Sequence, residues 1–166
     1  MTRIAIVILF IASFSEGIAQ EKQLWAKSFI NQEMPEFTVE GWLTEAPDYE
    51  GKFVLIDFWA TWCAPCRKAI PELNEISKEF AEDLVVIGIS DEPREKIESM
   101  TEVEIDYFSA YDTQKTLNTI FQVKGIPHAV IVDPQGIIRW EGYPLLSGHE
   151  LTQDVVRELI ESYKKE

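Results

Sequence analysis

The chain has 166 residues, of which 46% are hydrophobic and 27% are charged, as expected of a soluble globular protein with one domain of ordinary size. Its formal net charge of −14 at pH 7 argues against nucleic acid and anionic membrane surfaces as partners. The acidity identifies no partner by itself, because an acidic surface usually serves solubility.

Residues 1–19 have the pattern of a signal peptide. Arg3 supplies a positive charge, the apolar run at 4–12 is too short to span a bilayer comfortably, and the small residues Gly17 and Ala19 fit a cleavage site. We therefore expect a periplasmic or otherwise exported protein. Two alternatives stay open, namely an uncleaved segment that tethers the protein to a membrane and a buried N-terminal helix or strand.

The next segments lead into a buried strand. Residues 20–34 are expected to form an N-terminal linker, although their apolar side chains also have a roughly helical spacing. Residues 35–43 alternate apolar and polar side chains, which predicts a short exposed strand and a turn. Residues 53–59 are nearly all apolar, which is typical of a central strand covered on both faces. The predicted domain covers residues 35–166.

The remaining elements alternate helices with strands and then end on a hairpin and a helix. Crossover helices require a parallel sheet, and the hairpin adds antiparallel strands, so the fold class is α/β with one mixed sheet between helices. The predicted elements are a helix at 63–81 containing Pro71, a strand at 84–90, a helix at 91–100, a short strand at 107–111, a helix capped by Asp112 or Thr113, strands at 129–133 and 137–141, and a last helix to about residue 164 with Ser147 and Glu150 as its capping box.

The two cysteines, Cys63 and Cys66, lie where the buried strand passes into a helix. A helix N-terminus stabilises thiolates, and cysteines there titrate between about 3.5 and 7.5 instead of about 8.5. A disulfide closing so short a loop removes almost no entropy from the unfolded chain, so the pair is a poor structural staple. A zinc site would want four ligands, but the chain has no further cysteines, and only His128 and His149 remain as nitrogen ligands. The pattern predicts a redox-active disulfide, with no metal and no cofactor.

From Pro35 onward the sequence resembles the thioredoxin superfamily. The resemblance rests on Trp62-Cys63-Ala64-Pro65-Cys66 after a strand that ends in Phe58-Trp59-Ala60, on Asp57 six residues before Cys63, on Pro71 eight residues after it, and on Ile126-Pro127 as the cis-proline segment. It implies a thioredoxin-like fold, with a mixed sheet sandwiched by helices and a short N-terminal β extension.

Within that superfamily the chain is similar to exported reductants of the TlpA/ResA type, which have a redoxin (AhpC/TSA-like) domain. The signal segment, the N-terminal strand pair and an insertion at about 91–112 carry this likeness. It implies a thiol-disulfide oxidoreductase that keeps client cysteines reduced outside the cytoplasm, including those of apocytochrome c. Asp57 and His128 depart from the group, in which a neutral residue and a threonine are more usual.

We expect Cys63 to attack a client disulfide as a thiolate and Cys66 to resolve the mixed disulfide. Asp57 is expected to carry a proton for Cys66, since a buried carboxyl has a raised pKa. Alternatively, Asp57 only binds backbone groups.

The expected client-binding residues surround the pair. Trp62 would be an exposed platform, and Pro65 would tune the pair by removing an N–H donor. A cis Pro127 would leave the backbone of Ile126 available to a client strand. His128 would stabilise a thiolate if it pointed at the cysteines, or it is a core residue.

The predicted partners are client proteins with disulfides or thiols and an upstream membrane or periplasmic electron donor, with no nucleic acid, and the protein is expected to be a monomer. His149 is interpreted as a surface residue, and Glu92, Glu95 and Glu98 as a solvated helix face.

Two other functions stay open. A thiol peroxidase of the peroxiredoxin type wants threonine three residues before its cysteine, whereas Thr61 is two before Cys63, and a copper or metal carrier would use Cys63, Cys66 and His128.

Overall fold

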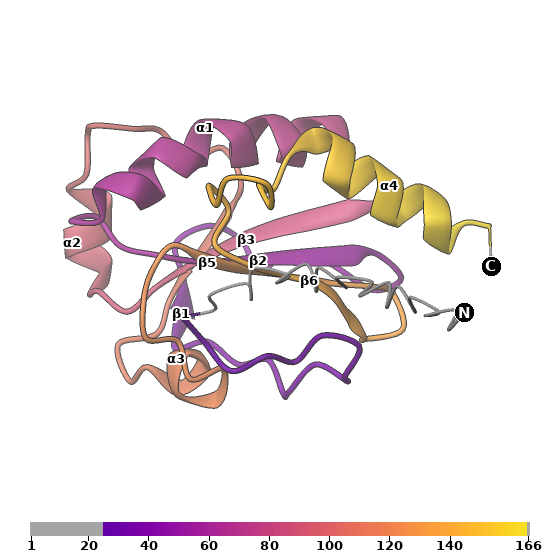
Figure 1. Ribbon diagram of the computed structural model, residues 1–166. Helices are drawn as coiled ribbons and strands as arrows, with labels where there is room; N and C mark the ends of the chain where they lie inside the picture. The colour runs from indigo at the N-terminus through magenta and orange to yellow at the C-terminus, as the bar shows by residue number, and fades with distance from the viewer. Residues whose placement is uncertain (1–24, 166) are drawn as a thin grey trace, which may run out of the picture.

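The sheet at the centre of the molecule has six strands in the order β1-β4-β3-β2-β5-β6. The computed structural model describes residues 25–165, so the predicted signal peptide at 1–19 lies outside the described residues (Figure 1). β2 pairs in parallel with β3, and β3 with β4, whereas β5 runs antiparallel to both β2 and β6. The strands are β1 (Gly41–Trp42), β2 (Phe53–Trp59), β3 (Leu84–Ser90), β4 (Phe108–Tyr111), β5 (His128–Val132) and β6 (Ile138–Gly142).

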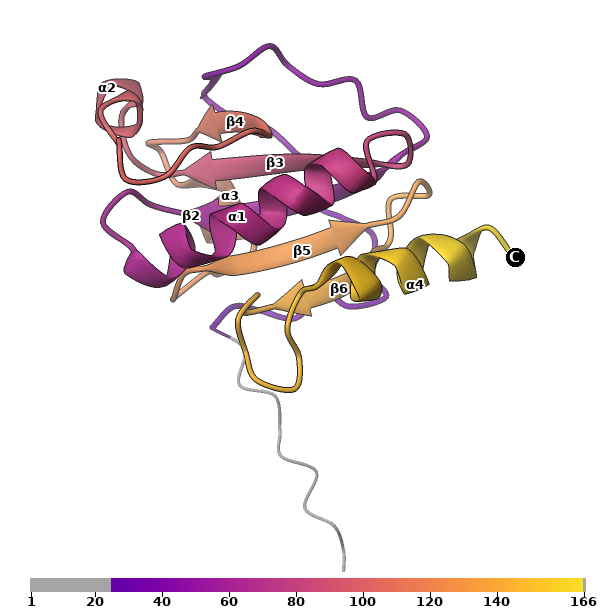
Figure 2. The ribbon, with the colours of Figure 1, turned by 90° about the horizontal axis from the view of Figure 1, so that it is seen from above.

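Helices cover both faces of this sheet. The long helices α1 (Ala64–Glu79) and α4 (Gln153–Tyr163) lie on one face, where Figure 2 shows α1 over the central strands and α4 on the β6 side. The short α3 (Thr116–Ile120) lies on the other face, and α2 (Arg94–Glu98) stands at one end of the sheet (Figure 1). The predicted α/β class and the mixed sheet between helices are confirmed, and β1 is the short N-terminal β extension.

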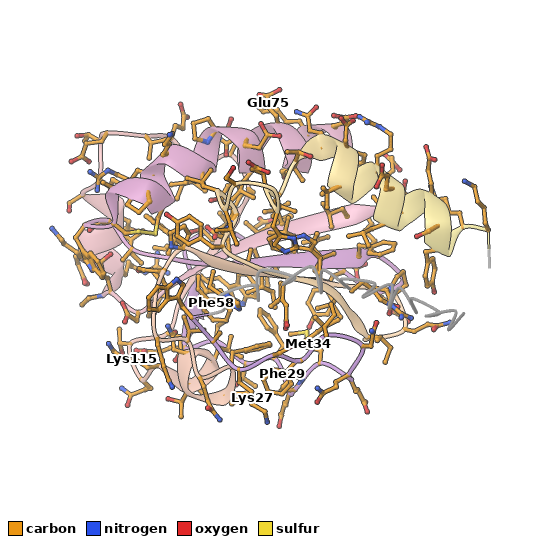
Figure 3. All side chains as sticks on the ribbon, in the orientation of Figure 1. Lys27, Phe29, Met34, Phe58, Glu75 and Lys115 are labelled. Atoms are coloured by element: carbon orange, nitrogen blue, oxygen red, sulfur yellow. A yellow bond between two sulfur atoms is a disulfide. The ribbon has the colours of Figure 1, made fainter. Side chains whose placement is uncertain are left out.

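The strand β2 is buried along its whole length because both faces are covered. Its side chains alternate between two cores, as the period of a strand requires. Phe53, Leu55 and Trp59 belong to the core beneath α1 and α4. Val54, Ile56 and Phe58 belong to the core on the α3 side, and Figure 3 shows Phe58 and Phe29 on that side of the sheet. Asp57 shares the α1 face with the first set, since it has the same parity.

The last helix begins later than predicted. α4 starts at Gln153 with Thr152 as its cap, whose hydroxyl accepts from the Val155 N–H at 3.3 Å. The predicted capping box of Ser147 and Glu150 is wrong, because Gly148 adopts a φ of +78° and its N–H donates to the Glu150 carboxylate at 2.9 Å. These residues therefore form a turn rather than the first turn of a helix.

The helices of the middle region are shorter than predicted. α3 begins after Lys115, which has a φ of +57°, so neither Asp112 nor Thr113 is its N-cap residue. The Asp112 carboxylate nevertheless accepts from the Leu117 N–H at 3.0 Å and so satisfies a donor of the first helical turn. Of the helix predicted at 91–100, only residues 94–98 are helical, as α2.

Residues 29–34, which we call the edge strap, run along the free edge of β6 instead of forming a helix. The Asn31 N–H donates to the Ile138 carbonyl at 2.8 Å, and the Ile138 N–H donates back to the Gln32 carbonyl at 3.0 Å. Phe29 is buried, with its ring edge against Phe121 at 5.3 Å between centroids. The described part of the predicted linker is thus packed on the domain.

Candidate active site

Cys63 and Cys66 form a disulfide at the start of α1, with their Cα atoms 5.2 Å apart. Cys63 is the N-cap residue, and its sulfur accepts from the Cys66 N–H at 3.2 Å. Pro65 is exposed in the first turn, where a missing N–H costs nothing. A negative charge on the Cys63 sulfur would be stabilised by this N–H and by the positive end of the helix.

The two tryptophans that closely precede the disulfide in the chain differ sharply in exposure. Trp62 is 68% exposed, whereas Trp59 is 2% exposed in the α1-side core. Trp62 lines a groove together with the apolar Val123 and Ile126 and the charged Asp91, Lys115 and Lys124. A groove that combines apolar and charged side chains is therefore open beside the disulfide.

The peptide bond between Ile126 and Pro127 is cis. It lies in the loop before β5, and Ile126 is half-buried at the boundary of both cores. The groove residues therefore come from the loop after β2, from the loop before β5 and from the start of α3, with Asp91 following β3.

His128 is 2% exposed and stands in register with Phe58, with the two ring centroids 6.0 Å apart. Register partners of antiparallel strands point to the same face, so His128 lies on the α3 side of the sheet with Phe58. Asp57 and the cysteines belong to the α1 side. This packing favours the interpretation of His128 as a core residue.

Asp57 is fully buried in β2, on the face that α1 covers. Neither of its carboxylate oxygens has a hydrogen-bond partner among the described residues, so the alternative that Asp57 binds backbone groups is wrong. Burial raises the pKa of Asp57 from 3.8 to about 7, because the ionised form loses its hydration. A carboxyl with this pKa exchanges protons readily near neutral pH.

Glu92 is a functional-site residue that the sequence interpretation missed. It is only 9% exposed, and its carboxylate accepts from the Thr61 N–H at 2.6 Å and the Thr61 hydroxyl at 2.8 Å. The interpretation of Glu92 as part of a solvated helix face is wrong, because α2 starts only after it. Arg67 donates to the Thr61 carbonyl, so acid and guanidinium together fix the turn before Cys63.

The register of β2 and β3 accounts for this contact. Trp59 is in register with Ser90 in the parallel pair of β2 and β3, so the residues two positions beyond each strand also meet. The spacing of Glu92, Glu95 and Glu98 suggested a helix face instead.

His149 is not a surface residue, contrary to expectation. It is half-buried and stacks on Trp140, with ring centroids 4.9 Å apart and planes 8° from parallel. One ring nitrogen lies 3.2 Å from the Glu141 carbonyl oxygen. This stacking ties the turn before α4 to β6.

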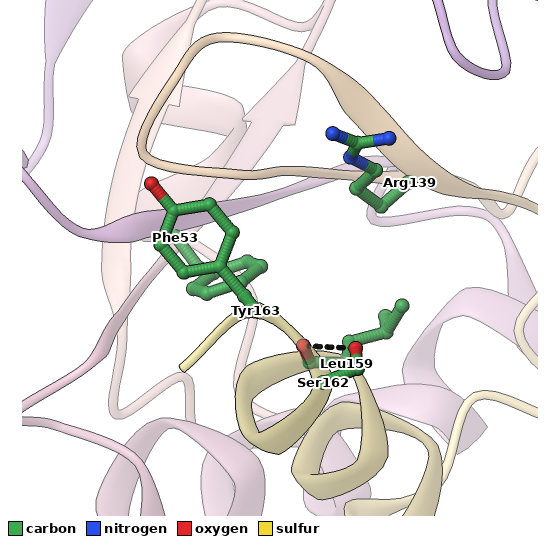
Figure 4. Close-up of a pocket in the computed structure, with 5 residues that line it drawn as sticks. All are labelled: Phe53, Arg139, Leu159, Ser162 and Tyr163. Atoms are coloured by element: carbon green, nitrogen blue, oxygen red, sulfur yellow. Dashed lines mark hydrogen bonds between the residues drawn. The ribbon is translucent and has the colours of Figure 1, made fainter. Parts of the chain in front are cut away.

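A small pocket lies near the opposite end of β2, lined by Phe53, Arg139, Leu159, Ser162 and Tyr163 (Figure 4). Phe53 packs edge-on against Tyr163 at 5.4 Å, and the Ser162 hydroxyl donates to the Leu159 carbonyl at 2.8 Å. Six residues of strand span about 20 Å between Phe53 and Trp59. The pocket is therefore separate from the disulfide.

Within residues 25–165, no group of three or more histidine, cysteine or acidic side chains is placed to hold a metal ion. In that same part of the chain, no helix is both long and apolar enough to cross a bilayer.

Comparison with known proteins places this geometry in a family. Residues 30–141 match the AhpC/TSA family. The thioredoxin-like protein YneN of Bacillus subtilis is 33% identical over 115 residues, which cover 65% of this chain and 68% of the relative. The thiol-disulfide oxidoreductase ResA of Bacillus cereus is 27% identical over 169 residues, covering 96% of this chain and 92% of the relative.

Among solved structures, the thioredoxin domain of a thiol-disulfide oxidoreductase from Bacteroides vulgatus superposes with a TM-score of 0.65. It is 24% identical and covers 82% of this chain and 99% of its own. This likeness shows the thioredoxin-like fold.

Proposed function

Because the chain belongs to the AhpC/TSA family, we propose that it is an exported thiol-disulfide oxidoreductase that reduces or exchanges disulfides in client proteins. The observation that carries this proposal is the disulfide between Cys63, the N-cap residue of α1, and Cys66 in the first turn. A helix N-terminus lowers thiol pKa values and a short ring lets two thiols cycle with a disulfide. The electrons are held by the cysteines, so the reaction needs no further cofactor.

The cycle begins with the reduced pair. The Cys63 thiolate attacks a sulfur of the client disulfide, the client S–S bond breaks, and the released client thiolate takes up a proton. Cys66, once deprotonated, attacks the Cys63 sulfur of the mixed disulfide and frees the second client thiol. Two electrons pass to the client, and Cys63–Cys66 is left oxidised. A dithiol of an upstream membrane or periplasmic donor reduces it again.

Asp57 is proposed as the proton carrier for Cys66. Both residues are fully buried on the α1 side of the sheet, and the pKa of Asp57 is raised to about 7 by burial. A carboxyl of that pKa can accept the Cys66 proton as the resolving thiolate forms and return it in the reverse reaction.

The client is proposed to lie across the groove between Trp62 and Ile126. The backbone groups of Ile126, beside the cis Pro127, would pair with an extended client segment as a short added strand. Trp62 would cover the apolar side of that segment, while Pro65 limits the number of N–H donors at the sulfurs. His128 would contribute to client binding indirectly, because its packing in the core fixes the position of the loop that holds Ile126 and Pro127.

The cellular setting rests on the N-terminus and on the relatives. Residues 1–19 have the pattern of a signal peptide, and ResA and DsbE proteins are among the relatives of the chain. We propose a periplasmic or otherwise exported monomer, with clients such as apocytochrome c.

Two variants test the mechanism. Cys63→Ser should abolish disulfide exchange while circular dichroism shows an intact fold, and Cys66→Ser should accumulate client joined to Cys63, as mass spectrometry of trapped mixed disulfides would reveal. Exchange at the normal rate by Cys63→Ser would contradict the mechanism. Peroxide consumption faster than client reduction would instead favour the thiol peroxidase alternative.

A further inference from the structure

The loop that joins α3 to β5 carries several of the groove residues beside the disulfide. Residues 123–126 of this loop line the groove with Trp62, and the cis Pro127 follows them. On its C-terminal side the loop is fixed by the pairing of β5 with β2. On its N-terminal side, Gln122 has a φ of +49°, a left-handed conformation that persists only where the surrounding structure holds it. The position of Ile126 therefore depends on what contacts the loop before it.

That contact is made by residues 25–28, which we call the N-terminal arm. The Lys124 N–H donates to the Trp25 carbonyl at 2.6 Å, and the Lys27 N–H donates to the Phe121 carbonyl at 3.0 Å. The arm thus pairs with the loop through the backbone at two places. It continues directly into the edge strap, which is anchored in the core on the α3 side of the sheet (Figure 3).

Gly125 lets the arm lie this close to the loop. A Cβ atom on residue 125 would lie 3.1 Å from Cβ and 3.2 Å from Cγ of Trp25, closer than the ordinary carbon contact of about 3.5–4.0 Å. Trp25 therefore packs directly on the backbone of Gly125, although it is 49% exposed overall. Glycine has more backbone freedom than any other residue. Without this packing, Gly125 would be the most flexible point of the loop, next to Ile126.

The arm lies before residues 30–141, which match the AhpC/TSA family, so the family match does not cover it. Trp25 is not among the residues that line the groove, so it would act through the loop. We propose that the arm belongs to the client-binding site, and that Trp25 is a positioning residue that holds residues 124–126 in the conformation with which a client segment pairs. This inference rests on the proposed function and adds to it what fixes the backbone of Ile126.

A loop that is already held binds a client more tightly than a loose one. Each backbone residue that becomes ordered on binding costs free energy, and preorganisation removes that cost. Releasing Gly125 should therefore weaken client binding about five- to tenfold. The attack of the cysteine on a bound disulfide should change little, because Glu92 and Arg67 hold the turn before Cys63.

The main test compares a large and a small disulfide substrate of the full chain, with dithiothreitol as the electron donor. Insulin is a polypeptide that can pair with the loop, whereas hydroxyethyl disulfide is too small to do so. Trp25→Ala should raise the KM for insulin about five- to tenfold, with little change in kcat or in the rate with hydroxyethyl disulfide. Trp25→Phe, which keeps an aromatic ring against Gly125, should recover most of the affinity.

Ile30→Ala is the matched control. Ile30 is an apolar residue of similar exposure, 40% against 49% for Trp25, and it lies just after the arm. Its replacement should change neither the KM for insulin nor the rate with hydroxyethyl disulfide.

A second variant approaches the same contact from the loop. The methyl group of Gly125→Ala would displace the Trp25 side chain, so the KM for insulin should rise as in Trp25→Ala. Amide hydrogen exchange measured by NMR reports on the arm without any client. The Lys124 N–H should exchange faster in both variants, because its acceptor is the Trp25 carbonyl.

An unchanged KM for insulin in both Trp25→Ala and Gly125→Ala would overturn the inference. An equal loss of rate with hydroxyethyl disulfide would also overturn it, since the arm would then act on the cysteines or on the fold. The proposed function fails in a different way, because the wild-type protein would then exchange neither disulfide.

Discussion

Two buried acids, Asp57 of β2 and Glu92 after β3, differ in their hydrogen-bond partners. Asp57 lies beneath α1 with no hydrogen bond to its oxygens from the described residues, and burial raises its pKa to about 7. Glu92 lies beyond β3, where its carboxylate accepts from both the N–H and the hydroxyl of Thr61 and from the Ser90 hydroxyl.

The number of hydrogen bonds that each carboxylate accepts decides whether it can take up a proton or holds the backbone in place. A carboxylate that is buried without protein donors gives up stability and gains a proton affinity useful near neutral pH. A carboxylate that satisfies three donors holds a turn in place. In the proposed function, one carboxylate therefore transfers a proton while the other holds the turn before Cys63.

The largest effect is expected from Asp57→Asn. The folded-state pKa is about 7 and the ordinary value is 3.8, so between these values the folded protein binds more protons than the unfolded chain. Stability contributed at this site is therefore greatest below pH 3.8 and declines as pH rises to about 7, by about 4 kcal/mol in all. Asp57→Asn should remove this decline, so its advantage over wild type in urea unfolding should grow from pH 4 to pH 8.

The same variant should slow disulfide exchange near neutral pH, since Cys66 loses its proton carrier. A stability difference between Asp57→Asn and wild type that does not change with pH would show that Asp57 is ionised throughout, as a partnered acid would be.

The second effect concerns Glu92. Glu92→Ala leaves the Thr61 N–H and hydroxyl without their acceptor in a buried turn, which should cost about 2–4 kcal/mol in urea unfolding at pH 7. Glu92→Gln keeps one acceptor oxygen and should lose less than half as much. If Ala and Gln were equally destabilising, the charge of Glu92, and not its hydrogen bonds to Thr61, would be what stabilises the turn.

The smallest effect is expected at an exposed acid. Glu98 is 54% exposed and pairs with Arg94 at 3.0 Å along α2. Glu98→Gln should change the free energy of unfolding by less than about 0.5 kcal/mol, because exposed ion pairs contribute little. Measured beside Asp57→Asn and Glu92→Gln, it gives the baseline for removing a carboxylate charge. If Glu98→Gln lowered the free energy of unfolding as much as Glu92→Ala, burial and hydrogen-bond partners would not explain how these acids differ.

The buried strands could be predicted closely from the sequence. The strands at 53–59 and 84–90 have the predicted bounds, because nearly continuous apolar runs have no place in this fold except between two layers of helices. The disulfide position followed in the same way from a cysteine pair between a strand and a helix.

The environment of each acid could not be predicted from the pattern. Glu92 has the spacing of a helix face with Glu95 and Glu98, but its contact with Thr61 depends on the register of two strands. The start of α4 was missed for a similar reason, since Gly148 and Glu150 form a local turn that competes with the expected capping box. The stacking of His149 on Trp140 depends on tertiary packing across β6.

The edge strap also limits how the chain can be shortened. β6 is an outer strand of the sheet, and the strap pairs with the Ile138 backbone at its start through Asn31 and Gln32, while the Met34 N–H donates to the Gly136 carbonyl in the turn before it. An uncovered outer strand is a template onto which another chain can add. A protein beginning at Pro35 would keep the disulfide and every helix, yet it would present this edge to its neighbours, so self-association into aggregates should appear before any loss of chemistry at the cysteines.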